Sequence, residues 1–252
     1  MNTDKKCTRH PLDFPFSKKK FLEFSYTAVR DQFPSMSEFI SFFDSIEGEE
    51  QKNLFLNTAT FYLFLVKQGD WIVDIAGSDP IVDYLTDTYK YIGIFSLIES
   101  LQQNNFIDFY TYLLRRKSNV EFPIKDEKAL KSWYRKYKKE FGSTQKAIGF
   151  FNSLDKESQE ALIQKLEIVK IKPTQEALIQ KLEIKKTKPT IENLSKYLYE
   201  LRSKFVHEAK LILNMSAGTA IGKTGKKFVV CKLSIKDLKN FFEEGLVKHF
   251  KV

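Results

Sequence analysis

The sequence predicts an all-α fold, on three observations. Apolar residues recur at helical spacing through most of the chain. Residues that favour helix N-termini, Ser35, Asp79 and Ser234, come directly before such runs. The chain is 42% hydrophobic and 14% aromatic, which suffices for a sizeable core. The β-prone stretch at 218–233 contains three glycines and predicts one small β-hairpin or an extended connector.

The apolar runs predict the following elements. Helices are expected at 18–32, 35–46, 49–68, 79–101, 105–117, 191–214 and 234–250. Residues 1–17 are polar and contain two prolines, so we expect a flexible arm there. We therefore divide the chain into this arm, an N-terminal helical segment at 18–78 and a helical bundle at 79–252.

The helix expected at 81–101 is apolar on almost every face, which predicts a place at the centre of the bundle. Glu99 lies near its end. Two interpretations stay open for this residue: a carboxylate that reaches the surface near the helix end, or a polar group aimed at a functional site.

The chain has a net charge of +9, which permits a polyanionic partner such as RNA. Its cations are mostly lysine, however, whereas a dedicated phosphate-binding protein favours the bidentate arginine. The basic region at 115–142 interleaves aromatic and basic residues around Trp133. Its candidate RNA-binding residues are Arg115, Arg116, Arg135, Lys136, Lys138 and Lys139. The alternative is a surface helix that buries Trp133 and Tyr137 while its lysines face water.

Several classes of protein are not expected. Cys7 and Cys231 lie at opposite ends of the chain, without the spacing of a disulfide framework or a zinc site. We therefore expect no metal and no other cofactor. The N-terminus has no apolar leader, and the most apolar run, 54–66, is too short to cross a bilayer. We expect a cytoplasmic protein with no membrane partner.

Residues 159–190 contain a tandem duplication. The sequence QEALIQKLEIVKIKPT at 159–174 is followed by QEALIQKLEIKKTKPT at 175–190. Two copies of 16 residues are too few and too short for a solenoid. We interpret the duplication as an insertion in a tolerant surface loop, and expect two short helices or a helix and a mobile arm.

Residues 217–224, AGTAIGKT, match a loose phosphate-loop pattern. That loop needs a strand before it and a helix after it, so that backbone N–H groups cradle a phosphate. Here a helix precedes the pattern and a β-prone stretch follows it. We therefore do not expect a phosphate loop.

The helix expected at 191–214 carries an arginine and a histidine of catalytic interest. Projected at 100° per residue, it places an apolar stripe toward the core, made of Leu194, Leu198, Leu201, Phe205, Ala209 and Ile212. Arg202 lies at the edge of the stripe, and His207 lies roughly 140° further round, on a second face with Val206, Tyr199 and Ser203 between them. The two can meet only if a second copy of the helix packs against this face about a two-fold axis. An imidazole near a guanidinium suits metal-independent RNA cleavage.

The segment Tyr199-Glu-Leu-Arg-Ser-Lys-Phe-Val-His207 matches the R-x(4–6)-H motif of the HEPN (higher eukaryotes and prokaryotes nucleotide-binding) superfamily. With the apolar helix ending at Leu101 and the closing amphipathic helix, the chain resembles the ApeA-like branch over roughly 80–250. The resemblance implies a homodimer through the helix at 191–214. It also implies catalytic roles for Arg202 and His207, with Ser203 as the polar residue after the arginine. Active members often carry Asn, Asp or His at the Ser203 position.

Three functional hypotheses follow. The first is a metal-independent endoribonuclease of a prokaryotic defence or toxin system. The second is a catalytically silent HEPN-like module that binds RNA, a nucleotide or a protein. The third is a helical scaffold with no role in nucleic-acid binding. Ser203 and His207 are not expected to form a nucleophile pair, because no orienting acid accompanies them.

Overall fold

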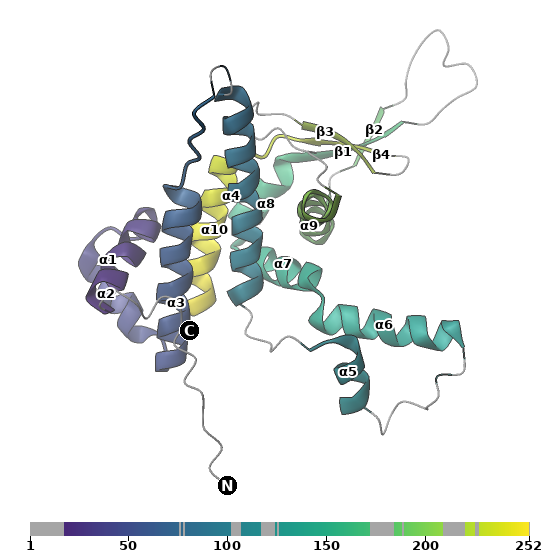
Figure 1. Ribbon diagram of the computed structural model, residues 1–252, viewed down its shortest axis with the longest axis horizontal. Coiled ribbons are helices and arrows are strands. Elements are labelled where there is room, and N and C mark those ends of the chain that lie inside the picture. Colours follow the sequence, from purple (N-terminus) through teal and green to yellow (C-terminus); the bar gives the residue numbers. More distant parts are fainter. Residues whose placement is uncertain are drawn as a thin grey trace.

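The computed structural model describes residues 18–75, 77, 79–101, 107–116, 124, 126–171, 184–187, 189–208, 220–224 and 227–251. The helices are α1 (Lys18–Val29), α2 (Met36–Ser45), α3 (Glu49–Tyr62), α4 (Asp79–Leu101), α5 (Phe109–Arg115), α6 (Glu127–Phe141), α7 (Ser143–Asn152), α8 (Lys156–Gln164), α9 (Ile191–Glu208) and α10 (Ile235–Phe250), with short turns η2 (Arg30–Gln32) and η3 (Leu63–Lys67) (Figure 1). The prediction of a mostly helical fold is confirmed. The predicted arm at 1–17 lies outside the described residues.

Helix boundaries follow the predicted caps. The Ser35 hydroxyl accepts a hydrogen bond from the backbone N–H of Glu38, and α4 begins at Asp79. Ser234 and Asp237 form a capping box at the start of α10. The helix predicted at 105–117 is shorter, as α5. The helix predicted at 191–214 is described as α9 as far as Glu208, and its remaining residues lie outside the described part.

The strands form one antiparallel sheet in the order β2-β1-β4-β3. They are β1 (Leu166–Ile171), β2 (Ile184–Thr187), β3 (Ala220–Thr224) and β4 (Lys227–Cys231). The predicted hairpin at 218–233 is confirmed as β3 and β4. The phosphate-loop pattern ends in β3, whose residues pair with β4, so this part of it forms no cradle of free N–H groups.

The expectation for the duplication at 159–190 is wrong in part. Its first copy begins in α8, as predicted for a helix, but then continues as β1, and the second copy supplies β2. The physical reason lies outside the repeat. β1 pairs with β4 from Leu166↔Cys231 to Lys170↔Lys227, so a distant strand supplies the backbone hydrogen bonds that local helical spacing does not reveal.

One hydrophobic core joins most of the helices. It contains buried residues of α1, α2 and α3 together with residues of α4, α7, α8, α9 and α10. The predicted segments 18–78 and 79–252 therefore share a core. Ile94, Phe95 and Ile98 of α4 are almost fully buried, so the central place predicted for this helix is found for its second half. The first half is not central, because Ile81 is 64% and Tyr89 45% exposed.

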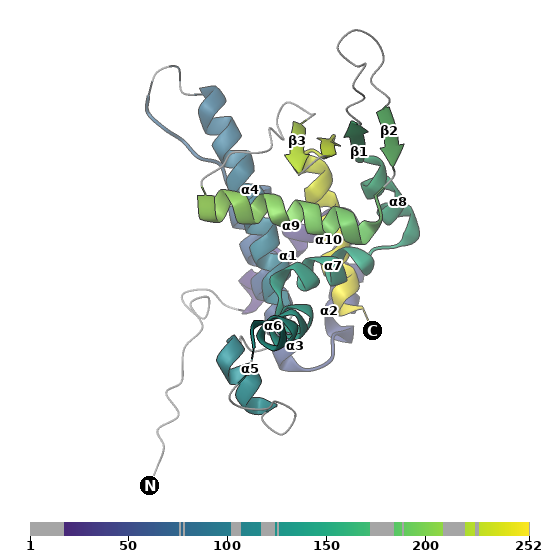
Figure 2. The ribbon, with the colours of Figure 1, turned by 90° about the vertical axis from the view of Figure 1, so that its right-hand side faces the viewer.

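A second, smaller cluster lies at the base of the molecule. Helices α5 and α6 pack on each other and extend away from the bundle, with α6 leading directly into α7 (Figures 1 and 2). Trp133 and Tyr137 of α6 are half-buried against this cluster, as the surface-helix alternative predicts. Across the described residues, no helix combines the length and the apolar character needed to cross a membrane.

Candidate nucleic-acid interface

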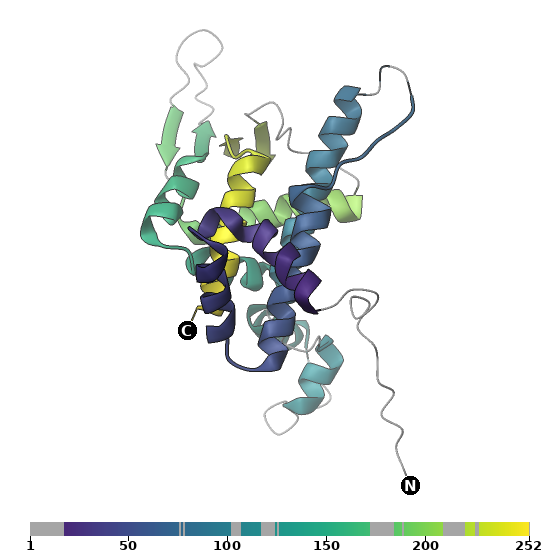
Figure 3. The same ribbon diagram turned by 90° about the vertical axis from the view of Figure 1, so that its left-hand side faces the viewer.

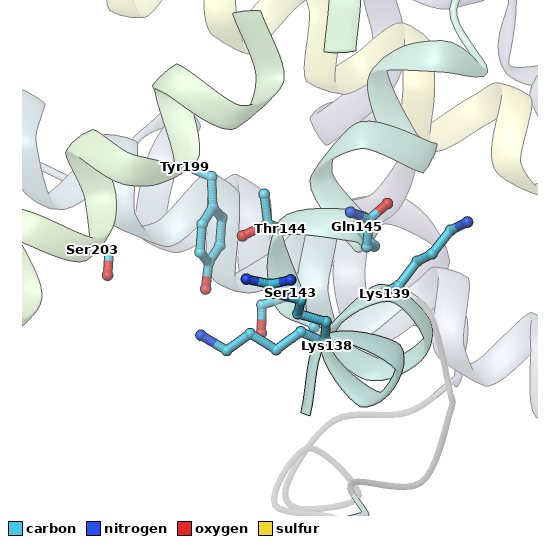
Figure 4. A pocket seen from close by; sticks show the side chains of 9 residues that line it. Lys138, Lys139, Ser143, Thr144, Gln145, Tyr199 and Ser203 are labelled. Carbon is cyan, nitrogen blue, oxygen red and sulfur yellow. The ribbon is translucent and has the colours of Figure 1, made fainter. Parts of the chain in front are cut away.

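A basic pocket lies where α6, α7 and α9 meet. Its volume is about 490 Å³, and it is open to solvent. It is lined by Arg135, Lys138, Lys139, Gly142, Ser143, Thr144, Gln145, Tyr199 and Ser203 (Figure 4). The pocket thus joins three of the candidate RNA-binding cations to Ser203 of the predicted catalytic set.

The corner between α6 and α7 creates this pocket. Gly142 ends α6, and α7 begins at the next residue. A Cβ atom at Gly142 would lie 2.2 Å from the backbone oxygen of Lys138, so a side chain does not fit at this corner. The tight corner turns the last turn of α6, which carries Lys138 and Lys139, toward the first turn of α7.

The first turn of α7 adds positive potential. Its N-cap is Gly142, which offers no side chain to accept a hydrogen bond from the helix N–H groups. The N-terminus of a helix carries a partial positive charge, which favours an anion. Ser143, Thr144 and Gln145 from this turn line the pocket beside the cations of α6.

The opposite wall of the pocket belongs to α9. In Figure 4 the hydroxyl of Tyr199 points toward the α6–α7 corner, and Ser203 lies one turn further along α9. Burial raises the pKa of Tyr199 above the ordinary tyrosine value. The phenol is therefore neutral at physiological pH and can donate a hydrogen bond.

Arg202 forms an ion pair with Glu99. Its Nη2 lies 3.6 Å from Oε1 of Glu99, and its guanidinium stacks over the ring of Tyr199 at 5.6 Å. The side chain of Arg202 is 16% exposed. Of the two interpretations of Glu99, the structure supports a polar group aimed at the site, because its side chain is only 24% exposed and lies against Arg202.

His207 lies in the last turn of α9 and is exposed. It is one residue beyond the exposed Val206 and does not line the pocket. The structure of one chain therefore brings Ser203 to the pocket and Arg202 against Tyr199, which lines it, and does not bring Arg202 and His207 together.

The remaining candidate cations divide into two groups. Lys136 and Arg116 line an adjacent hollow of about 400 Å³, which Lys139 also lines. Arg116 is already bound, since its Nη2 lies 2.7 Å from Oε1 and 2.8 Å from Oε2 of Glu140. Lys136 lies 4.2 Å from the Trp133 ring centroid. Arg115 is exposed at the end of α5, outside both hollows.

The apolar stripe predicted for α9 is found in the described residues as far as Leu201. Leu194, Leu198 and Leu201 are buried, whereas Phe205 is only half-buried. Ala209 and Ile212 lie outside the described residues. Tyr199 and Ser203, predicted to face a second copy, line a pocket against α6 and α7 of the same chain. The reason is the unpredicted α7, which packs along α9.

Sequence reasoning missed the first turn of α7. The signal was present, because a glycine followed by serine and threonine is typical of one helix ending and another beginning. No group of three His, Cys, Asp or Glu side chains suited to a metal ion occurs among the described residues. The chain matches no family model, no curated protein and no solved structure in the three comparisons made with known proteins.

Proposed function

We propose that this chain is a HEPN-type RNA-binding protein of a prokaryotic defence or toxin system, which cleaves RNA without a metal as a homodimer. The observation that carries the proposal is the basic pocket. Arg135, Lys138 and Lys139 lie in one cavity with Ser203, the residue next to Arg202. A phosphate bound there by these cations would lead the RNA backbone past the motif helix.

The proposed reaction is an attack by the neighbouring 2′-hydroxyl. His207 removes the 2′-hydroxyl proton, and the 2′-oxygen forms a bond to phosphorus. The bond from phosphorus to the 5′-oxygen then breaks, leaving a 2′,3′-cyclic phosphate. The departing 5′-oxygen takes up a proton from water and leaves as a 5′-hydroxyl, and His207 returns to water the proton that it took. Arg202 stabilises the charge of the phosphorane between these steps. Because His207 lies five positions after Arg202, roughly 140° further round the helix, the arginine of one protomer would serve the histidine of the other.

One observation favours the silent module as a second candidate. Arg202 is mostly buried and lies against Glu99, so its charge is already balanced within the chain. An RNA-binding protein with the same pocket and no cleavage would need no contact between Arg202 and His207.

Mixing two inactive variants tests the shared site. Arg202→Ala and His207→Ala are each incubated with structured RNA in EDTA, alone and after mixing by partial unfolding and reassociation. If each site needs one residue from each protomer, the mixture regains about a quarter of the wild-type rate, because half of the dimers then hold one intact site. No cleavage by wild-type protein at high concentration overturns the ribonuclease and leaves the silent module.

RNA binding is measured separately, by fluorescence anisotropy with labelled RNA. We expect Lys138→Glu to weaken binding about tenfold and to reduce the salt dependence, because it removes one phosphate contact. Lys128→Glu is the matched control, since Lys128 is exposed on the same helix and does not line the pocket. Equal loss in both variants, or none in either, contradicts a phosphate site in this pocket.

A further inference from the structure

An apolar surface with acidic neighbours lies beside α4 and shares no residue with the lining of the basic pocket. Trp71 and Ile72 precede α4, Tyr89 lies within it, and Phe205 and Val206 lie at the end of α9. We call these five residues the α4 apolar surface. Ile72 is 94% exposed, and Trp71, Tyr89 and Val206 are each about half exposed. Exposed apolar groups of this size mark an interaction site.

Ring contacts join the α4 apolar surface across three segments of the chain. The rings of Trp71 and Tyr89 stack with centroids 5.0 Å apart. Tyr89 in turn meets Phe205 edge-on, with centroids 6.1 Å apart. The surface therefore runs from the segment before α4, across α4, to the last turns of α9.

An ion pair fixes the segment before α4 in place. Nζ of Lys90 lies 2.6 Å from Oδ1 of Asp70, beside the stacked rings of Trp71 and Tyr89. In Figures 2 and 3 the first half of α4 projects beyond the rest of the bundle. The rings of Trp71 and Tyr89 are thus held together beside the projecting part of α4.

The charge of this region is opposite to that of the whole chain. The 21 residues from 69 to 89 contain five aspartates and no lysine, arginine or glutamate, in a chain whose net charge is +9. Asp74 and Asp83 are exposed, and Lys90, next to Tyr89 in the chain, is 12% exposed and paired with Asp70. The five aspartates of residues 69–89 disfavour contact with phosphates, so we argue for a basic partner of this segment and not for RNA.

We propose that the α4 apolar surface binds a basic amphipathic segment of another protein. The apolar side chains of that segment would cover Trp71 and Ile72, and its lysines or arginines would face Asp74 and Asp83. Because the surface ends at Val206, a bound partner would also cover the neighbouring His207. Binding itself does not depend on the proposed ribonuclease activity.

A pair of synthetic peptides tests the charge and the apolar contact together. The probe is an 18-residue peptide of leucine and lysine at helical spacing, labelled for fluorescence anisotropy. A second peptide, labelled in the same way, carries glutamate in place of each lysine. We expect the lysine peptide to bind the full chain at least tenfold more tightly than the glutamate peptide, and to lose affinity as salt is raised. Equal binding of both peptides, or binding of neither, overturns the proposal.

Matched variants place the binding on this surface. Ile72→Ser and the double variant Asp74→Lys/Asp83→Lys should each weaken binding of the lysine peptide about tenfold. The controls are Leu130→Ser and Asp44→Lys, which change exposed residues elsewhere. Equal effects of the control variants overturn the proposal. Dissociation of a homodimer by Ile72→Ser, measured by sedimentation, overturns it as well, because a second copy of the chain would then occupy the surface. RNA cleavage by these variants is scored separately, so failure of the peptide to bind does not bear on the ribonuclease.

Discussion

The hydroxyl of Tyr62 donates a hydrogen bond of 2.6 Å to Oε1 of Glu243, joining α3 to α10 inside the core. Both residues are buried, and Nζ of Lys67 lies 2.9 Å from the same oxygen. A buried carboxylate is stable only with such partners. The N-terminal helices are therefore joined to the last helix by a polar contact as well as by apolar packing.

Replacing Tyr62 with phenylalanine tests this contact. The change keeps the ring and removes the hydroxyl, so Glu243 loses a donor in a buried place. We expect the free energy of unfolding to fall by about 1–3 kcal/mol, as for a buried polar group left without its partner. Urea unfolding measures the change. Tyr110→Phe is the control, since Tyr110 is 68% exposed. This variant should have the same free energy of unfolding as the wild type.

Alkaline pH should destabilise the fold. Burial raises the pKa of Tyr62, Tyr91 and Tyr197 above the ordinary tyrosine value. Above pH about 10 the unfolded chain loses these protons while the folded chain keeps them, so the stability present below this pH is lost as pH rises. We expect the urea midpoint to fall between pH 9 and pH 11. Tyr62→Phe should show a shallower fall, and an unchanged slope in that variant would contradict the assignment.

Packing of α10 against α7 gives a third prediction. A Cβ atom at Gly245 would lie 2.4 Å from Cζ of Phe150, whose ring is buried and stacked on Phe242. Gly245→Ala should therefore lower the free energy of unfolding by about 1–3 kcal/mol, although alanine favours helix formation. The exposed Asn240 on the same helix supplies the control, because Asn240→Ala should leave stability the same or higher.

The ion pair of Glu99 and Arg202 gives a fourth prediction. Removing either charge leaves the other mostly buried, so Glu99→Gln and Arg202→Gln should each cost about 1–2 kcal/mol. The double variant should cost less than the sum of the two by at least about 0.5 kcal/mol. The exposed pair of Glu192 and Lys196 should show almost no coupling in the same measurement. Strict additivity for Glu99 and Arg202 would mean that the ion pair does not form in solution.

Local signals made the helices predictable. Ser35 and Ser234 cap the helices that follow them, and the apolar spacing of Leu194, Leu198 and Leu201 identified the buried face of α9. These features depend on neighbours within a few residues, so the sequence displays them directly.

The basic pocket and the sheet were not predictable in the same way. The pocket depends on the corner at Gly142, which turns α6 toward α9. The strand β1 depends on β4, which begins more than fifty residues later. The separate sequence signals for Ser203 and for Lys138 were both recognised, but only the packing of α7 against α9 brings the two residues to one cavity.

The pairing of β1 with β2 has a symmetry that follows from the duplication. Ile168 of the first copy corresponds to Ile184 of the second, and Ile171 corresponds to Thr187. Ile168 pairs with Thr187, the second-copy residue that corresponds to Ile171. Ile171 in turn pairs with Ile184, the residue that corresponds to Ile168. The repeated segment is thus complementary to itself. A single copy could form this ladder only between two molecules, and duplication supplies the matching strand within one chain.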